Sequence, residues 1–230
     1  AVKSEPIVQS DETVLPFLGK RMYTWAFNCP SFVVYAIGTR SGEMLAKVLG
    51  KLFRGIIGCD CYTVYFSYAK DKAMVVLQLC MAHLKRDFEY FAGYDLSRPD
   101  IVRFGNRGVT LVGNICHVHN ELERLRESGE ESSDRYRELQ AELVRLKGEL
   151  VAHAAAPPEG CRRAKAIAKR FAKYGHYYFT FMDYPGVQPT NNGAELAIRA
   201  KPVPSRRNSL GSKSCRATST WRPSGPSRRR

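Results

Sequence analysis

The stretch Ile56-Ile57-Gly58-Cys59-Asp60-Cys61-Tyr62 places an acidic residue directly after a short apolar run. Short apolar runs rich in β-branched residues are typical of buried strands. A second stretch, Ile7-Val8-Gln9-Ser10-Asp11-Glu12-Thr13, repeats this arrangement, and we expect its strand to end at Asp11. If the two strands are neighbours, Asp11 and Asp60 lie side by side at a sheet edge, where α/β proteins commonly bind ligands. Taken singly, each is more typical of a turn residue.

The region around these two stretches, residues 6–92, alternates short strands with helices. Further strands are predicted at 22–28, 32–37 and 74–79, and helices at 41–53 and 82–91. Three hairpin-compatible strands come first, and the later strands are linked through helices. This order predicts an α/β fold with a mixed sheet and helices on its faces.

Strand signals stop after residue 92, and helical periodicity replaces them. A coiled-coil-like stripe steps by three and four residues through Tyr136, Leu139, Leu143, Leu146 and Leu150. A polar break at 128–133 predicts a helical hairpin, and another basic helix is predicted at 161–174. We therefore divide the chain into the first part of an α/β core (1–92), a helical insertion (93–187), a final helix that completes the core (188–203) and a basic, disordered tail (204–230).

The formal net charge of +14 is concentrated at one end of the chain. Residues 199–230 hold ten basic and no acidic residues, which leaves 26 basic against 22 acidic residues elsewhere. The tail fits a polyphosphate partner, whereas the body is only mildly basic. Apolar runs fall short of the ~18 residues that a membrane span needs, and the N-terminus does not resemble a signal peptide. Seven cysteines without a paired metal or disulfide frame favour a reducing compartment, so we expect a cytoplasmic protein.

A third acidic residue stands in Thr190-Asn191-Asn192-Gly193-Ala194-Glu195, where a helix is predicted to begin. Asn192 and Glu195 have the spacing of a capping box, which is the structural interpretation of this pair. A carboxylate in a first helical turn can also face the end of a sheet, so the two roles are compatible. Three converging carboxylates are what an enzyme needs to hold two divalent metal ions on a phosphodiester.

Four blocks of the sequence resemble the catalytic domain of insertion-sequence 66 family transposases, in the three-carboxylate, ribonuclease H-like superfamily. They are Asp11-Glu12-Thr13, Asp60-Cys61-Tyr62 with Tyr65, the run from Leu79 to Arg86, and Asn191-Asn192-Gly193-Ala194-Glu195 with Ile198-Arg199. Their order and approximate spacing also resemble the family over residues 6–214. The resemblance implies a ribonuclease H-like mixed sheet with an all-helical insertion before the last catalytic helix.

The resemblance also implies a chemistry. It implies DNA cleavage and strand transfer with two Mg²⁺ ions, replaceable by Mn²⁺, held by Asp11, Asp60 and Glu195. The residues expected to support this site are Cys80, His83, Asn191 and Asn192. Expected contacts to DNA phosphates are Arg86, Arg199, Lys201, Arg206 and Arg207. The last four can equally be a solvated charged tail. Expected partners are transposon ends and target DNA, bound by a homo-oligomer at the bacterial nucleoid.

The sequence departs from the family pattern at both ends. It begins just before the first catalytic strand, and after Ser214 the pattern dissolves where a family helix is expected. We therefore expect a truncated chain whose tail arises from a frameshift. Two alternatives to an active transposase stay open. One is an inactive fragment that at most binds DNA, and the other is a related nuclease that cuts without joining.

Two smaller patterns also have two interpretations. Cys80 and His83 form a zinc half-site that His117 and His119 could complete, although a buried cysteine is the simpler interpretation. The aromatic cluster at residues 174–181 can stack on nucleic acid bases, but core packing is the simpler interpretation.

Overall fold

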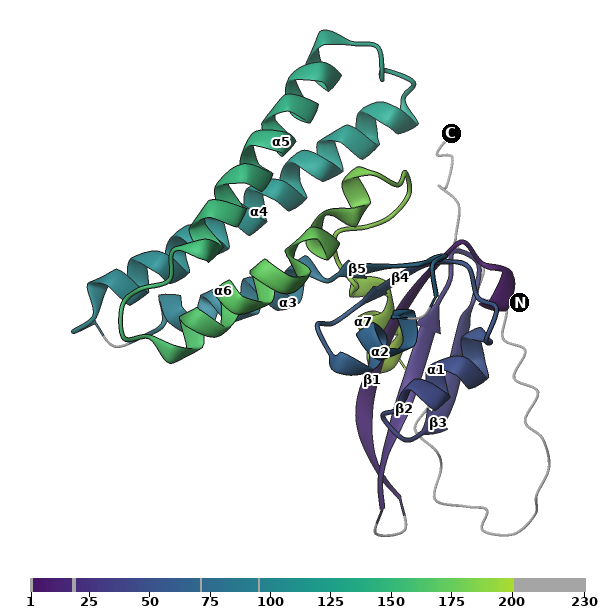
Figure 1. Ribbon diagram of the computed structural model, residues 1–230. Coiled ribbons are helices and arrows are strands. Elements are labelled where there is room, and N and C mark those ends of the chain that lie inside the picture. The colour runs from purple at the N-terminus through teal and green to yellow at the C-terminus, as the bar shows by residue number, and fades with distance from the viewer. Residues whose placement is uncertain (1, 18–19, 71, 95, 201–230) are drawn as a thin grey trace, which may run out of the picture.

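A computed structural model shows a mixed α/β fold built on one five-stranded sheet (Figure 1). The structure describes residues 2–17, 20–70, 72–94 and 96–200. A short 3-10 helix (Val2–Ser4) precedes the first strand. The predicted α/β class is confirmed, and the sheet is compatible with a ribonuclease H-like arrangement.

The strands follow the order β3-β2-β1-β4-β5 across the sheet. An antiparallel meander forms from β1 (Ile7–Phe17), β2 (Lys20–Asn28) and β3 (Val33–Gly38). The other two strands run parallel to β1 and are β4 (Gly55–Cys59) and β5 (Val75–Leu79). Parallel strands need crossover connections, and helices supply them here.

β1 is longer than the sequence predicts. Its antiparallel partner β2 pairs with it as far as Phe17, whereas β4 pairs only with the first three residues, from Ile7 to Gln9. The β1–β2 ribbon therefore extends past the end of the parallel strands. The prediction that the strand ends at Asp11 is wrong, because the hairpin continues the pairing there. Asp11 nevertheless lies just beyond the residues that pair with β4.

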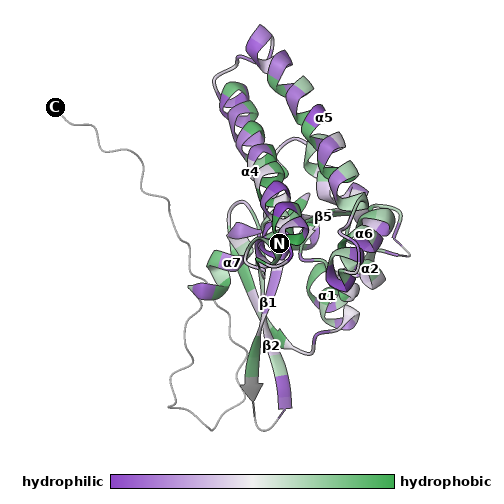
Figure 2. Cartoon of the chain, turned by 90° about the vertical axis from the view of Figure 1, so that its left-hand side faces the viewer, coloured by the Kyte–Doolittle hydropathy of each residue, from purple (hydrophilic) through white to green (hydrophobic). Residues whose placement is uncertain are grey.

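Helices cover both faces of the sheet. α1 (Gly42–Leu49) and α7 (Asn192–Arg199) lie on opposite sides of β1 and β2 (Figure 2). α2 (Thr63–Ala69) lies between β4 and β5 in the chain and packs against α1. The apolar core between this layer and the sheet includes Trp25, Leu45 and Tyr65, which are all fully buried.

The remaining helices form an array that projects away from the sheet (Figure 1). It consists of α3 (Met81–Ala92), α4 (Pro99–Glu127), α5 (Asp134–Ala155) and α6 (Arg162–Tyr174). α4 packs along α3 and forms the predicted hairpin with α5. All five residues of the predicted stripe on α5 are buried, which confirms that interpretation. The division of the chain at residues 92, 187 and 203 stays a prediction.

A 3-10 helix, η2 (Gly175–Met182), returns the chain to the sheet. Thr180 Oγ1 donates to the Leu77 carbonyl oxygen at 2.6 Å, and the Phe181 N–H donates to Gln78 Oε1 at 2.8 Å. Tyr178 and Phe179 are buried, so core packing is the right interpretation for these aromatic residues. Among the helices of the described residues, none is both long and apolar enough to cross a bilayer.

A glycine on α4 allows this helix to approach α3 closely. A Cβ atom at Gly105 would overlap the backbone nitrogen of Ala92 and lie 2.7 Å from the carbonyl oxygen of Phe88. Backbone atoms cannot move aside as a side-chain tip can. On the same helix, a Cβ at Gly113 would meet no described atom within 4 Å.

We therefore expect opposite effects from alanine at these two positions of α4. Gly105→Ala should lower the free energy of unfolding by about 1–3 kcal/mol or more, because it overpacks the α3–α4 contact. Gly113→Ala should raise it by up to about 1 kcal/mol, because alanine favours a helix over glycine. Urea unfolding of both variants measures this, and equal stabilities would contradict the close α3–α4 packing.

Candidate carboxylate site

The site begins where β1 and β4 run side by side. Gln9 pairs with Gly58, and continuing this parallel register places Asp11 beside Asp60. Neighbouring strands lie about 4.8 Å apart, so the two carboxylates share the end of the parallel part of the sheet. The two strands are neighbours, as the sequence-based expectation required.

Two hydrogen bonds of Asn191 hold the segment before α7 against this end of the sheet. Its buried side chain donates from Nδ2 to the Ser10 carbonyl oxygen at 2.7 Å, and its backbone N–H donates to Cys80 Sγ at 3.1 Å. Gln9 adds a bond from its Nε2 to the Thr190 carbonyl oxygen at 3.1 Å. The first turn of α7, which carries Glu195, is therefore held next to β1.

The pKa of Asp11 reflects its burial and the acidic groups around it. Burial raises this pKa to about 7, and the neighbouring charges of Glu12, Asp60 and Glu195 add to the rise. Negative charges act in this way only over short distances in a protein. Asp60 and Glu195, which come from other segments of the chain, are therefore near enough to Asp11 to act on its charge, and a shared metal site of the three carboxylates stays a prediction.

The predicted capping box of Asn192 and Glu195 does not form. The N-cap residue of α7 is Asn191, and its side chain makes no capping hydrogen bond. The side-chain amide of Asn191 donates to the Ser10 carbonyl oxygen instead. Asn192 is exposed at the first position of the helix, and the Glu195 carboxylate turns to basic side chains. Tertiary contacts have replaced the local cap.

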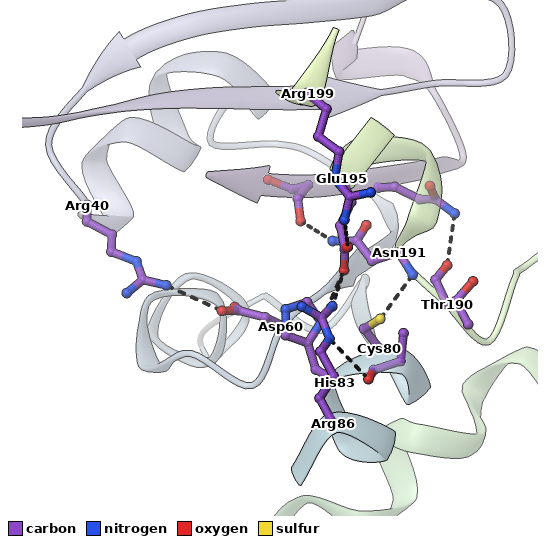
Figure 3. A network of polar contacts seen from close by, with 12 residues as sticks. Arg40, Asp60, Cys80, His83, Arg86, Thr190, Asn191, Glu195 and Arg199 are labelled. Carbon is purple, nitrogen blue, oxygen red and sulfur yellow. Dashed lines mark hydrogen bonds and ion pairs between the residues drawn. The ribbon is translucent and has the colours of Figure 1, made fainter. Parts of the chain in front are cut away.

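Three basic side chains surround Glu195 (Figure 3). Arg86 Nη2 lies 2.5 Å from Oε1, His83 Nδ1 lies 3.6 Å from the same oxygen, and Arg199 Nη2 lies 3.6 Å from Oε2. Burial and the charge of Arg86 lower the pKa of His83, so its imidazole is neutral near pH 7. The positive charge at Glu195 therefore comes from the two exposed arginines, Arg86 and Arg199.

Arg40 plays a similar part at Asp60, through a residue pair that the sequence analysis overlooked. Its Nη2 lies 3.3 Å from Asp60 Oδ2, and its Nε lies 2.5 Å from Oε1 of Glu12, whose side chain is only 1% exposed. Tyr65 donates its hydroxyl hydrogen to Glu12 Oε2 at 2.7 Å, and the guanidinium lies 3.4 Å from the Tyr62 ring centroid. The alternation of side chains along β1 could have revealed this pair from the sequence. Adjacent strand residues point to opposite faces, so Glu12 lies on the face opposite to Asp11.

One oxygen of Asp60 lacks a partner. Oδ1 is buried and accepts no hydrogen bond from any described residue. Burial and the charge of Glu12 raise the pKa of Asp60 to about 6, against the opposing effect of Arg40. A buried carboxylate oxygen is costly when it is left unpaired. This oxygen, close to a second carboxylate, has the character of a ligand for a hard cation.

The carboxylates of Asp11, Asp60 and Glu195 do not lie as close together as three ligands of one metal ion. Among the described residues, the group whose ligand atoms do lie within 4.8 Å of one another consists of Cys80, His83 and Glu195. Its donors suit zinc poorly. Burial raises the pKa of the Cys80 thiol, which already accepts the Asn191 N–H, whereas zinc binds the thiolate. His119, once considered as a further ligand, packs edge-on against Phe181 with ring centroids 4.9 Å apart.

The predicted DNA contacts fall into two groups. Arg86 and Arg199 lie beside Glu195 (Figure 3), and both side chains are exposed. Lys201, Arg206 and Arg207 lie outside the described residues, as does the tail in which the frameshift is expected.

Comparison with protein families adds one finding. Residues 1–220 match the family described as Transposase IS66 family. Among curated proteins, none matches the chain.

The raised carboxyl pKa values make the stability of the protein depend on pH. A carboxyl whose pKa is higher in the folded state binds more protons when folded, so stability falls as pH rises through that window. For Asp11 the window runs from its ordinary value of 3.8 up to about 7. Asp11→Asn cannot ionise, and in the presence of EDTA it should therefore exceed the wild type in stability at about pH 8 but not near pH 4.

Urea unfolding at both pH values measures this difference. Asp134→Asn, at a carboxylate that is 88% exposed on α5, is the matched control and should show the same stability difference from the wild type at about pH 4 and pH 8. If the gain of Asp11→Asn were independent of pH, the repulsion inferred at Asp11 would be absent.

Proposed function

Because this chain belongs to the IS66 family of transposases, we propose that it is a catalytic domain for metal-dependent cleavage and strand transfer of DNA. The observation that supports this proposal is the parallel register of β1 and β4, which sets Asp11 and Asp60 side by side, with Glu195 near enough to raise the pKa of Asp11. Oxygen ligands of this type suit Mg²⁺, and Mn²⁺ is the natural substitute.

The donor groups fit two divalent cations. Asp60 has a buried oxygen without a partner among the described residues, and the pKa of Asp11 is raised by burial and, in addition, by three negative neighbours. A bound cation would offset this repulsion and stabilise the ionised carboxylates. When bound, two Mg²⁺ ions would supply Lewis acidity to the attacking and leaving oxygens of a phosphodiester.

The protein itself would contribute position and charge. β1 carries Asp11, Asp60 directly follows the parallel neighbour β4, and the Asn191–Ser10 hydrogen bond holds the start of α7 against β1. In-line attack by water, or by a DNA 3′-hydroxyl, then needs no covalent bond between enzyme and DNA. The exposed guanidinium groups of Arg86 and Arg199 are placed to neutralise DNA phosphates at the mouth of the site.

The proposed substrate is DNA, as the family implies, in the form of transposon ends and target. We include a homo-oligomer in the proposal, because joining paired ends to one target requires two active sites. A nuclease that cuts without joining would share the same carboxylates, so the products of a reaction distinguish the two activities.

Calorimetric titration with Mn²⁺ tests the metal site directly. The wild-type chain should bind Mn²⁺, and both Asp60→Asn and Glu195→Gln should lose at least about tenfold in affinity, because each removes a charged ligand. The controls are Asp134→Asn and Glu138→Gln, at exposed carboxylates of α5, and they should bind as the wild type does.

Circular dichroism of each variant shows whether it is folded. A folded wild-type chain that binds no Mn²⁺ would refute metal-dependent catalysis and favour the inactive fragment. Binding that survives Glu195→Gln would remove Glu195 from the metal site.

Arg86 allows a second test, because it competes with a metal ion for Glu195 and also faces the DNA. Arg86→Ala should raise Mn²⁺ affinity by up to about fivefold, the value of an exposed ion pair. The same variant should weaken DNA binding and reduce its salt dependence, because a phosphate contact is lost. Calorimetry and fluorescence anisotropy measure the two effects, and a parallel loss of both affinities would show that Arg86 serves only to hold the fold.

A further inference from the structure

A pocket of about 500 Å³ opens beside the carboxylate site. Its walls come from β1, β2, α4 and the segment that leads into α7. Five of the nine residues that line it carry a carboxamide, and these are Gln9, Asn28, Asn120, Gln188 and Asn192. The other lining residues are Cys116, Pro189, Thr190 and Gly193. None of the nine is charged at neutral pH, since burial raises the pKa of the Cys116 thiol to about 11.

Gln9 connects this pocket to the carboxylates. Gln9 and Asp11 are two residues apart on β1, so their side chains point to the same face and lie about 7 Å apart along the strand. On the other side, the pocket residues Thr190 and Asn192 flank Asn191, which is bonded to Ser10. A group bound in the pocket would therefore lie close to a phosphodiester held at the carboxylates.

The floor of the pocket is formed by internal contacts. Gln9 Nε2 donates to the Thr190 carbonyl oxygen at 3.1 Å, and Asn28 Nδ2 lies 3.5 Å from Gln9 Oε1. A Cβ atom at Gly193 would overlap both Asn28 Nδ2 and Gln9 Oε1, so glycine lets α7 begin directly on this pair. Around the rim, Asn120 and Asn192 are exposed. Their donors and acceptors are available to a ligand.

Uncharged carboxamides suit the edge of a nucleobase better than a phosphate. Each offers a donor and an acceptor side by side, and this pair matches N7 and the N6 amino group of adenine. Phosphates are bound mainly by cations, which the site provides elsewhere, at Arg86 and Arg199. A base within a duplex cannot enter a concave pocket without leaving the stack.

We propose that this pocket binds an unpaired base of the DNA, preferably adenine, next to the phosphodiester at the carboxylates. The inference rests on the proposed function and adds to it a base-specific contact. The substrate would then be a DNA end in which one base near the reacting phosphate is unstacked.

Anisotropy of labelled single strands tests the proposal, with EDTA present to prevent cleavage. Strands of about 12 nucleotides match the usual site size of single-strand binders. The wild type should bind oligo(dA) about tenfold more tightly than oligo(dT) or oligo(dC), since one bidentate contact discriminates by about 1–3 kcal/mol. The double variant Asn28→Ala with Asn120→Ala should lose this preference and keep its affinity for oligo(dT).

Two further variants keep the test decisive. Asn120→Ala alone changes an exposed side chain on α4, and it should reduce the preference even if the double variant does not fold. Asn114→Ala is the matched control, because Asn114 is exposed on the same helix outside the pocket, and it should retain the full preference.

Four outcomes would overturn the proposal. The first is equal affinity of the wild type for all strands, and the second is a preference that survives in the pocket variants. The third is a preference lost equally in Asn114→Ala, and the fourth is a preference that appears only when the same strands are annealed to their complements. If the wild type binds no DNA at all, DNA is not the substrate and the proposed function fails together with the pocket proposal. Calorimetry with Mn²⁺ tests the metal site independently of this result. Loss of discrimination with DNA binding intact concerns the pocket alone.

Discussion

Burial of neighbouring carboxylates is the constraint on which the rest of this structure depends. The parallel register of β1 and β4 sets Asp11 beside Asp60, and burial together with the negative charge of neighbouring acidic groups raises their pKa values to about 7 and about 6. Groups that repel one another stay together only if a rigid framework holds them. The sheet provides this framework, and two arginines, Arg40 and Arg86, supply opposite charge.

The third carboxylate depends on a long-range attachment. A large helical array separates β5 from α7 in the chain, so Glu195 lies at the sheet only because contacts beyond that array return the chain to it. The Met81 N–H donates to the Pro189 carbonyl oxygen at 2.9 Å, and Asn191 bonds to both Ser10 and Cys80. These buried hydrogen bonds favour one position for the helix, because moving it would leave their donors and acceptors unpaired.

Charge is divided between the two sides of the proposed active site. Cations gather around Glu195, where a phosphate backbone would pass, while the neighbouring pocket is lined by neutral amides. Phosphate contacts position a nucleic acid and base contacts specify it, so the two surfaces suit different parts of one substrate. Helix α7 contributes to both surfaces, because Asn192 lines the pocket and Arg199 lies beside Glu195.

The sequence by itself determined the local features of the protein. Apolar runs predicted the five strands, and the spacing of Leu139, Leu143 and Leu146 predicted the buried stripe of α5. Acidic residues after apolar runs indicated that Asp11 and Asp60 would lie side by side if their strands were neighbours, and β1 and β4 are neighbours. Such patterns are readable because burial repeats with the period of a strand or a helix. Only the tertiary structure decided that β1 runs on to Phe17, that Glu12 pairs with Arg40, and that Asn191 bonds to Ser10 instead of capping α7. It also decided that amides from four segments line one pocket. Each of these outcomes depends on partners distant in the chain, and a hydrogen bond or ion pair leaves no periodic trace in the sequence.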